Sequence, residues 1–518
     1  MLLAYLIFIP AAASLFCLVI RSRPLMEWAN ILAFAATLVL ALALGQTVLA
    51  AGVLTEWDGF FYADALSAWM VLLISAVSLG ASLYAGGYFR RDVAGNALTP
   101  GRVKEYFVLT PLFSACMFFA VLANNLGVMW FAIEATALSS VLLVALYNRK
   151  TSLEAAWKYV MLGGLGLALA LFGTVFTYAA AIGKGGAEPL PSFDWSHFMT
   201  IAGQLNPRMI KLAFVFVLIG YGAKAGLAPM HTWLPDAHSE APSPTSAMLS
   251  GISLKVAIYA LLRFHILAMQ CLGPGFSRAL LLCFGLFSMF LAAPFILVQG
   301  NLKRMLAYSS LEHVGLICSG VGLGTPLTLF GALLHMGYHA LTKPALFFAA
   351  GNIHQRYHSM KFRVIGPGVI KTLPVTVLFM GLAAAAIVGL PPFGLFYSEL
   401  TILSGAVAAH RLIISFLILA ALVAVFCGVL KQLSRILIGE PPQSPSSRTL
   451  ASPTPVPPVP QGELGTAPKR ARANDRSAMD GVPAMGLLIA ALLLFSLWLP
   501  APLLHLLQKT ANLIGGKA

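Results

Sequence analysis

Charged residues are scarce in this sequence. Only 10% of its 518 residues are Asp, Glu, Lys or Arg, whereas 59% are hydrophobic. Soluble proteins carry about 25% charged residues. Together with a mean hydropathy of +0.85, this scarcity excludes an ordinary soluble protein, and we expect most of the apolar surface to face lipid.

Cysteine pairs and cofactor motifs are missing as well. The six cysteines form no CxxC pair, which argues against a disulfide framework or an iron–sulfur site. The sequence also lacks the GxGxxG, phosphate-loop and HExxH patterns that bind nucleotides or zinc. We therefore expect no cofactor and no metal in this chain, and any electron transfer to run through partner subunits.

Acidic residues are fewer than basic ones, at 18 against 33. In a soluble protein the net charge of +15 would suggest a nucleic-acid partner. Here the basic residues lie mostly in alternate loops between apolar segments, which is the pattern of the positive-inside rule. We therefore expect no nucleic acid, and predict a bacterial inner-membrane protein with both termini in the periplasm.

Long apolar segments fill most of the chain. A spanning helix needs about 20 mainly apolar residues, so we predict an all-α polytopic membrane protein with about 14 transmembrane helices. The first segment has no small-residue cleavage site and is expected to be the first helix rather than a removed signal. The segments lie at 2–20, 28–50, 63–86, 106–123, 126–147, 157–181, 210–229, 244–268, 278–298, 305–323, 326–350, 373–396, 405–431 and 482–507.

One stretch differs from the rest in composition. Residues 438–480 are rich in proline, serine and alanine and show no apolar periodicity, which predicts a disordered cytoplasmic linker. It would separate the main transmembrane domain at 1–437 from a C-terminal transmembrane helix within 481–518. Its KRAR cluster either contacts anionic lipid head groups or belongs to a solvated tether, and we favour the tether.

Ionisable residues interrupt the apolar segments. Near the bilayer centre such a residue costs about 2.5–3.5 kcal/mol, so a series of them predicts a polar interior or an ion path. The series is Glu134, Lys158, Lys224, Lys255, His313, His335, His339, Lys343 and Glu399.

Three of these residues recur at helical spacing. His335, His339 and Lys343 are four residues apart, which places them on one stripe of a helix. Either they relay protons along the helix, or the histidines form hydrogen bonds between helices while the lysine reaches toward the membrane surface. We favour the relay.

Prolines adjoin three of the charged sites. Pro229 follows Lys224, Pro344 follows Lys343, and a Pro-Pro pair precedes Glu399. Proline lacks an amide donor and frees a carbonyl one turn earlier. Helices break at membrane depth where their backbone lines a polar cavity or is packed within protein. The pattern therefore predicts a break beside each charged site.

Two further groupings are open to more than one interpretation. If Glu134 pairs with Lys224, opening the pair would release a proton toward Lys255, although a static pair would simply hold helices together. The motif HTWLPDAH places His231, Asp236 and His238 together. These three could bind metal, shuttle protons or order the loop, and we favour loop ordering at a point of proton entry.

Several long motifs lie between residues 60 and 435. GYGAKAGLAPMHTWLPDAHSEAPSP, NLKRMLAYSSLEHVGL and HMGYHALTKPALFFAAGNI resemble the antiporter-like, proton-translocating subunits of respiratory complex I. NNLGVMWFAIEATALSS and GLPPFGLFYSEL look closest to the component F family of hydrogenase-4. The resemblance implies about 14 helices with two inverted five-helix repeats and two broken helices.

The resemblance also implies an order along the proton path. Three positions depart from the family pattern: the Pro-rich linker, the proline at 344, and a glutamate at the last site, where a lysine can also stand. That last choice leaves the direction of the final step open. The implied path runs from Glu134 and Lys224 at the entry through Lys255 to His339 and Lys343, and leaves at Glu399.

Together these features predict a proton-translocating, non-catalytic membrane subunit of a hydrogenase-like or NADH-dehydrogenase-like complex, with other membrane and peripheral subunits as partners. A Na⁺/proton antiporter subunit is one alternative, but hard cations prefer several oxygen ligands and this interior is rich in lysine and histidine. A non-conducting anchor is the other, and it would not need a series of buried charges.

Overall fold

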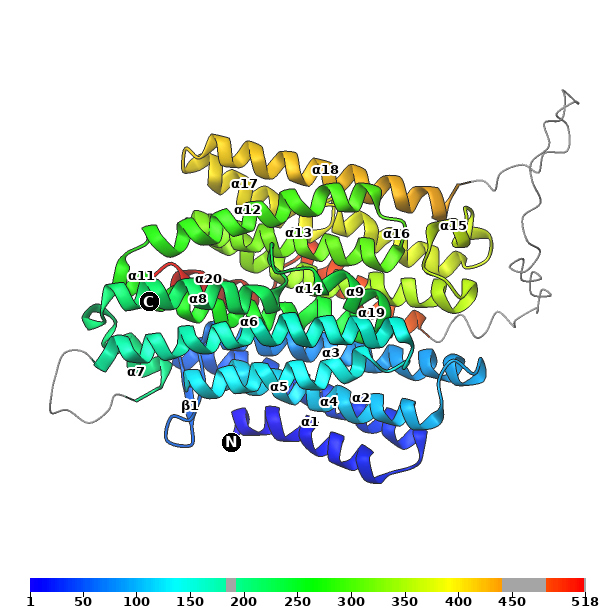
Figure 1. Ribbon diagram of the computed structural model, residues 1–518, viewed down its shortest axis with the longest axis horizontal. Coiled ribbons are helices and arrows are strands. Elements are labelled where there is room, and N and C mark those ends of the chain that lie inside the picture. The colour runs from blue at the N-terminus through cyan, green and yellow to red at the C-terminus, as the bar shows by residue number, and fades with distance from the viewer. Residues whose placement is uncertain (183–191, 440–480, 517–518) are drawn as a thin grey trace, which may run out of the picture.

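The computed structural model describes residues 1–182, 192–439 and 481–516, which are nearly all helical. Most of the long helices pack side by side along one direction of the molecule (Figure 1). A short hairpin of β1 (Leu54–Glu56) and β2 (Phe61–Ala63) connects two of them. Residues 440–480 of the predicted linker lie outside the described residues.

Nine helical segments in the described part of the chain are long and apolar enough to cross a membrane. One of them, Ser243–Leu272, joins α10 (Ser243–Met248), the π-helical η2 (Leu249–Ser253) and α11 (Leu254–Leu272). The others are α1 (Leu2–Val19), α2 (Arg23–Ala51), α3 (Ala65–Ala94), α4 (Pro100–Leu122), α5 (Leu126–Val144), α6 (Lys150–Ile182), α12 (Gly275–Val298) and α18 (Leu412–Leu437).

Five further segments bring the bundle to about 14 spans, as predicted. Two are long helices that carry buried titratable residues, two are broken helices, and one is a bent pair whose halves meet at 78°. They are α13 (Leu302–Leu323), α14 (Pro326–Tyr357), α8 (Pro207–Ala225) with α9 (Trp233–Glu240), α16 (Pro374–Ile387) with α17 (Gly394–Ala408), and α19 (Val482–Leu497) with α20 (Ala501–Ile514).

Short helices connect the spans at both ends of the bundle. α7 (Trp195–Thr200) and η1 (Ala202–Gln204) lie between α6 and α8. α15 (Phe362–Ile365) and η3 (Val369–Lys371) lie between α14 and α16. The predicted all-α polytopic fold is therefore confirmed.

Two sets of five spans share one order. The first is α4, α5, α6, α8 with α9, and α10 to α11; the second is α12, α13, α14, α16 with α17, and α18. The broken helix is the fourth span in each set. Because successive spans alternate in direction and five is odd, the two sets cross the membrane in opposite senses. This order matches the inverted repeats that the resemblance implied.

The predicted breaks beside Lys224 and Glu399 are both present. α8 ends before Gly226, whose φ of 78° is a left-handed conformation that glycine adopts without strain. α16 gives way to α17 across Pro391 and Pro392, which supply no amide hydrogen to continue the helix. Each break thus lies within a few residues of a buried charge.

The predicted break at Pro344 is wrong. α14 runs through this proline without interruption, and both Lys343 and Pro344 are fully enclosed by neighbouring helices. A membrane helix tolerates an internal proline where surrounding protein accommodates the freed backbone group. Lys343 is therefore held on a regular helix.

Two helix divisions differ from the predicted ones. The segment expected at 405–431 begins only at Leu412, because α17 continues to Ala408 and the chain turns at His410, which has a φ of 57°. The last segment, expected as one helix over 482–507, divides at Pro500 into α19 and α20. Both divisions fall inside nearly continuous apolar sequence, where the hydropathy pattern does not indicate where one helix ends and the next begins.

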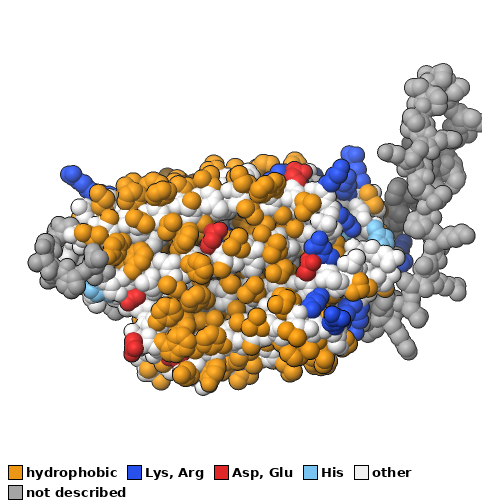
Figure 2. Space-filling model, turned by 60° about the horizontal axis from the view of Figure 1, so that its bottom comes forward, with side chains coloured by type: hydrophobic (Ala, Val, Ile, Leu, Met, Phe, Trp, Pro, Cys, Tyr) orange, Lys and Arg blue, Asp and Glu red, His pale blue; other side chains and the backbone are white. Residues whose placement is uncertain are grey.

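The exterior has the pattern of a membrane protein. Hydrophobic side chains cover the middle of the face in Figure 2, whereas most of its Lys and Arg gather at one end. Trp28, Phe131 and Trp157 are 60%, 61% and 67% exposed. An apolar belt with a basic rim is what a multi-pass protein presents to a bilayer.

Glycines set the distance between α12 and α13. A Cβ on Gly285 would lie 2.6 Å from the carbonyl oxygen of Gly315, and a Cβ on Gly315 would lie equally close to that of Gly285. Membrane helices approach closely where small residues leave room for the backbone. This close crossing positions α13, which carries His313.

Gly315→Ala is therefore expected to destabilise the protein by about 1–3 kcal/mol, because the backbone of α12 must shift to admit the methyl group. Gly381→Ala on α16 is the matched control, since nothing lies within 4 Å of a Cβ added there. Thermal unfolding of the purified membrane complex in detergent measures both variants. Equal unfolding temperatures would contradict the close crossing.

Candidate functional site

α14 lies at the centre of the buried titratable residues. It contacts α3, α10, α13, α16, α17 and α19 and is seen in the middle of the bundle in Figure 1. His335, His339 and Lys343 are all fully buried on this helix. The four-residue stripe predicted from the sequence is therefore an interior one, surrounded by protein rather than lipid.

Lys224 occupies the last turn of α8, directly before the first break, and is 1% exposed. Its Nζ donates a hydrogen bond to the Tyr159 hydroxyl at 2.6 Å, and that hydroxyl lies 2.7 Å from Ser140 Oγ on α5. The ammonium also lies 4.8 Å from the centre of the Tyr159 ring, within cation–π range. A hydroxyl pair thus links Lys224 to α5.

Glu134 lies on α5 near this group but does not touch Lys224. Ion pairs within 4.0 Å among the described residues do not include these two. Glu134 Oε2 has no hydrogen-bond partner there, although the two charges are close enough to interact electrostatically. Tyr159 therefore occupies the partner position that the ion-pair hypothesis gave to Glu134.

Lys255 lies at the start of α11, just after the π-helical turn η2, and is fully buried. Its Nζ donates to the Ser250 carbonyl oxygen at 2.5 Å and lies 2.5 Å from His339 Nδ1 on α14. Single π-helical turns inside α-helices are frequent at functional sites. The η2 turn supplies the Ser250 carbonyl oxygen as an acceptor for Lys255, whose Nζ also contacts His339.

Three histidines continue from Lys255 toward the second broken helix. The ring centres of His339 and His313 are 4.9 Å apart, with no hydrogen bond between the two described rings. His313 Nδ1 lies 2.9 Å from His335 Nε2. His335 Nδ1 lies 2.9 Å from the Ser398 hydroxyl on α17. Imidazole can donate at one nitrogen and accept at the other, so a chain of this kind can pass a proton stepwise.

Glu399 lies at the end of this histidine chain. It is 9% exposed on α17, and one ligand atom each of Glu399, His313 and His335 all lie within 4.8 Å of one another. Two histidines and a carboxylate could hold a metal ion. Two of these residues, His313 and His335, are also hydrogen-bonded to each other.

Lys343 stands beside the chain rather than in it. Its Nζ donates to the Leu306 carbonyl oxygen at 2.7 Å and to the Ser309 hydroxyl, both on α13. No described hydrogen bond joins it to a histidine. Lys343 therefore lies one helical turn from His339 on α14, but outside the hydrogen bond between Lys255 and His339.

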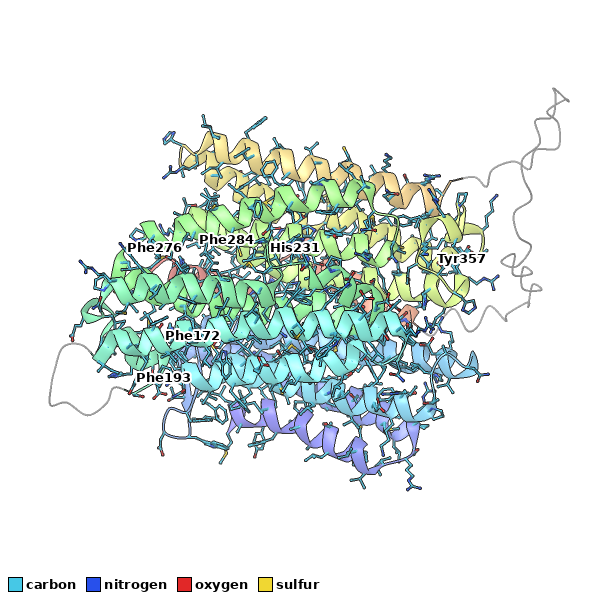
Figure 3. All side chains as sticks on the ribbon, viewed as in Figure 1. Phe172, Phe193, His231, Phe276, Phe284 and Tyr357 are labelled. Atoms are coloured by element: carbon cyan, nitrogen blue, oxygen red, sulfur yellow. The ribbon has the colours of Figure 1, made fainter. Side chains whose placement is uncertain are left out.

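The remaining predicted residues, Lys158, His231 and His238, are dispersed. Lys158 is 46% exposed and forms ion pairs with Glu154 at 2.6 Å and Asp236 at 3.0 Å. His231 lies in the first break, near the middle of the bundle in Figure 3, with Nδ1 3.2 Å from the Pro229 carbonyl oxygen. His238 is fully buried on α9 and stacks on a phenylalanine.

The HTWLPDAH residues therefore do not converge on one ligand. Asp236 instead bridges helices, because its carboxylate pairs with Lys158 on α6 and with Arg304 on α13, each at 3.0 Å. α9 begins without a side-chain cap, so this carboxylate does not cap the helix. Asp236 therefore connects α9 to two neighbouring helices by ion pairs and does not cap its own helix.

Residues that the sequence analysis did not single out complete the site. Tyr159, Ser140 and Ser398 supply hydroxyls beside the predicted lysines and histidines. Glu312 is a fully buried carboxyl next to His313. Among the described residues, no hydrogen bond connects Lys224 to Lys255, so the site consists of a group around Lys224 and a separate central chain that begins at Lys255.

Sequence comparisons identify relatives over most of the chain. Residues 123–425 match the family model described as NADH:quinone oxidoreductase/Mrp antiporter, TM. The hydrogenase-4 component F homolog of Methylacidiphilum infernorum is 40% identical over 385 residues, which cover 74% of this chain and 80% of that protein. Hydrogenase-4 component B of Escherichia coli is 32% identical over 351 residues, covering 65% and 49%.

Solved structures agree on the fold. A chain of the Mrp complex from Dietzia superposes with a TM-score of 0.81 at 21% identity, covering 99% of this chain and 96% of that one. A chain of respiratory complex I from Thermus thermophilus has a TM-score of 0.70 at 24% identity, covering 97% and 100%. The chain therefore belongs to the NADH:quinone oxidoreductase/Mrp antiporter family of polytopic membrane proteins.

Proposed function

We propose that this chain is the proton-translocating subunit of a membrane-bound redox complex of the hydrogenase-4 or NADH dehydrogenase type. The observation that carries the proposal is the buried series Lys255, His339, His313, His335 and Ser398, which ends beside Glu399. Hydrogen bonds join its members except at the step from His339 to His313, whose ring centres are 4.9 Å apart. An anchor without this function could replace every member by an apolar residue at lower cost. Electron transfer belongs to partner subunits.

The group around Lys224, which we assign to the entry of the proton path, supplies the switch that starts proton transfer. The Lys224 ammonium rests on Tyr159, while the Glu134 carboxylate has an unpartnered oxygen nearby. A charge change in a neighbouring subunit that draws Lys224 toward Glu134, or away from it, changes how tightly Lys224 holds its proton. The break in the first broken helix follows Lys224 by one residue, so the lysine lies at a helix end next to non-helical backbone.

The orientation follows from the surface charge. Figure 1 marks the N- and C-terminal ends toward one end of the bundle, and Figure 2 shows most Lys and Arg at the other. By the positive-inside rule, we assign the basic end to the cytoplasm of a bacterial inner membrane and both termini to the periplasm. α18 ends and α19 begins at the basic end, which supports a cytoplasmic location for the segment between them.

The partners are the other membrane and peripheral subunits of such a complex. The structural neighbours are chains of multisubunit assemblies, including a membrane-bound sulfane sulfur reductase and the Mrp complex. Lipid-facing side chains cover much of the described surface. In this proposal, the redox reaction that drives the protons takes place in a neighbouring subunit.

Glu399→Gln tests the function at the end of the chain. We expect redox-driven proton uptake into vesicles carrying the assembled complex to fall about tenfold or more, because glutamine cannot take up and release a proton at this point. Glu105→Gln is the control, since Glu105 is 48% exposed and pairs only with Arg102.

The same assay distinguishes protons from Na⁺. Wild-type uptake is expected to persist when K⁺ replaces Na⁺, because the path is built from lysine, histidine and hydroxyl groups rather than a cage of oxygen ligands. Uptake that requires Na⁺ would favour the antiporter alternative. Full proton uptake in the Glu399→Gln variant would contradict the assignment of Glu399 to the exit of the proton path.

A further inference from the structure

Glu312 on α13 is a buried carboxyl group without hydrogen-bond donors. It is fully enclosed, and neither carboxyl oxygen has a hydrogen-bond partner among the described residues. Burying an ionised carboxylate without donors is expensive, by several kcal/mol in order of magnitude. Such a residue either holds a proton or shares the charge of a nearby cation.

The neighbours of Glu312 belong to two separate parts of the site. Its Oε2 lies 3.3 Å from His313 Nδ1, in the histidine chain. Lys343, which stands outside that chain, and Glu399, which lies at its end, are also close enough to interact with Glu312 electrostatically. Lys343 already donates to Ser309, one turn before Glu312 on the same face of α13.

We propose that Glu312 carries protons between Lys343 and His313, and so connects Lys343 to the histidine chain. This inference rests on the proposed function. Lys343 needs such a link because its described hydrogen bonds lead only to α13. The flexible four-carbon stem of a lysine allows Nζ to move from Ser309 toward the carboxylate one turn away.

The transfer balances as two proton steps. In the first, an N–H bond of the Lys343 ammonium breaks and an O–H bond forms on the Glu312 carboxylate, leaving a neutral amine and a neutral carboxylic acid. In the second, that O–H bond breaks and an N–H bond forms at His313 Nδ1. The same nitrogen lies 2.9 Å from His335 Nε2, so it can pass the proton on when that atom is unprotonated.

The competing role is static compensation, in which Glu312 only neutralises Lys343. The two roles differ in a double variant. If the carboxyl carries protons, Glu312→Gln and Lys343→Met each lower uptake, and the double variant is no better than either, because the variants interrupt one link. If Glu312 only compensates charge, the neutral double variant recovers uptake.

The experiment uses the complete membrane complex in sealed vesicles, with redox-driven proton uptake and electron transfer measured on the same sample. We expect Glu312→Gln to lower uptake about tenfold, less than a fully essential carrier because Lys255 also feeds the chain. Glu312→Asp should retain part of it. The control is Glu27→Gln, an acid on α2 that pairs with Arg23.

Two outcomes overturn the inference: full uptake in Glu312→Gln, or recovery in the double variant. Lys255→Ala in the same series separates failure of the inference from failure of the proposed function. If Lys255→Ala loses uptake and Glu312→Gln does not, only the role of Glu312 is wrong. If neither loses uptake, the proton path itself is wrong.

Discussion

Replacing Lys255 by alanine is expected to lower redox-driven proton uptake at least about 100-fold while the complex still assembles. A positioned proton carrier typically contributes a factor of about 10²–10⁴ in rate. Lys255 Nζ is the hydrogen-bond partner of His339 Nδ1, and His339 Nε2 has no other partner among the described residues. Without the lysine, the His339 ring loses its only hydrogen bond among the described residues, and the chain loses its first member.

Inverted vesicles containing the assembled complex provide the measurement, with a pH-sensitive dye inside them and the redox reaction followed separately. Lys211→Ala is the control, because Lys211 is an exposed lysine on α8 whose ammonium lies over Phe276. We expect the control to keep its uptake. Normal uptake in Lys255→Ala would show that protons bypass the centre of the chain.

The second large effect concerns stability. Asp64→Ala is expected to destabilise the protein by about 3–5 kcal/mol, because it leaves a buried arginine uncompensated. Arg263 on α11 is 2% exposed and forms a bidentate ion pair with Asp64 at the start of α3, at 2.5 and 2.8 Å. Its guanidinium also lies 4.3 Å from the Trp195 ring centre.

The double variant Asp64→Ala/Arg263→Met identifies the cause. Replacing a whole buried pair by apolar groups is often nearly neutral, so the double variant should regain most of the lost thermal stability. Glu105→Ala, which removes half of an exposed pair, should change stability by less than about 1 kcal/mol. Equal losses in Asp64→Ala and Glu105→Ala would show that the buried pair contributes no more than a surface one.

Much of the fold could be predicted from the sequence, because lipid imposes simple rules. Spans need long apolar runs, and each run becomes a helix since no other structure satisfies its backbone in a bilayer. Boundaries inside continuous apolar sequence were less predictable. The turn before Leu412 and the bend at Pro500 depend on packing, which hydropathy does not record.

Prolines were a partial guide to the broken helices. Pro229 and the Pro391–Pro392 pair lie in breaks that also contain glycines with positive φ, Gly226 and Gly389. Pro344 stands alone inside a well-packed helix, and α14 continues through it. A criterion that required a glycine near the proline would have distinguished the two broken helices from the uninterrupted α14.

The candidate site residues were predicted from their charge, and this criterion identifies only part of the site. His335, His339 and Lys343 share a helix, so their common stripe followed from spacing alone. The contact between His313 and His335 joins two helices and required the three-dimensional structure. Lys158 was chosen for its charge, yet the next residue, Tyr159, turned by about 100° around the helix, faces Lys224.

The central claim is that the buried lysines and histidines conduct protons, and Lys224 at the entry tests it most directly. The measurement is the number of protons taken up per electron transferred, in vesicles with the complete complex carrying Lys224→Ala or, as a control on the same helix, Lys211→Ala. We predict that the ratio collapses in Lys224→Ala while electron transfer and assembly persist, and that Lys211→Ala keeps the wild-type ratio. A wild-type ratio in Lys224→Ala would contradict the account.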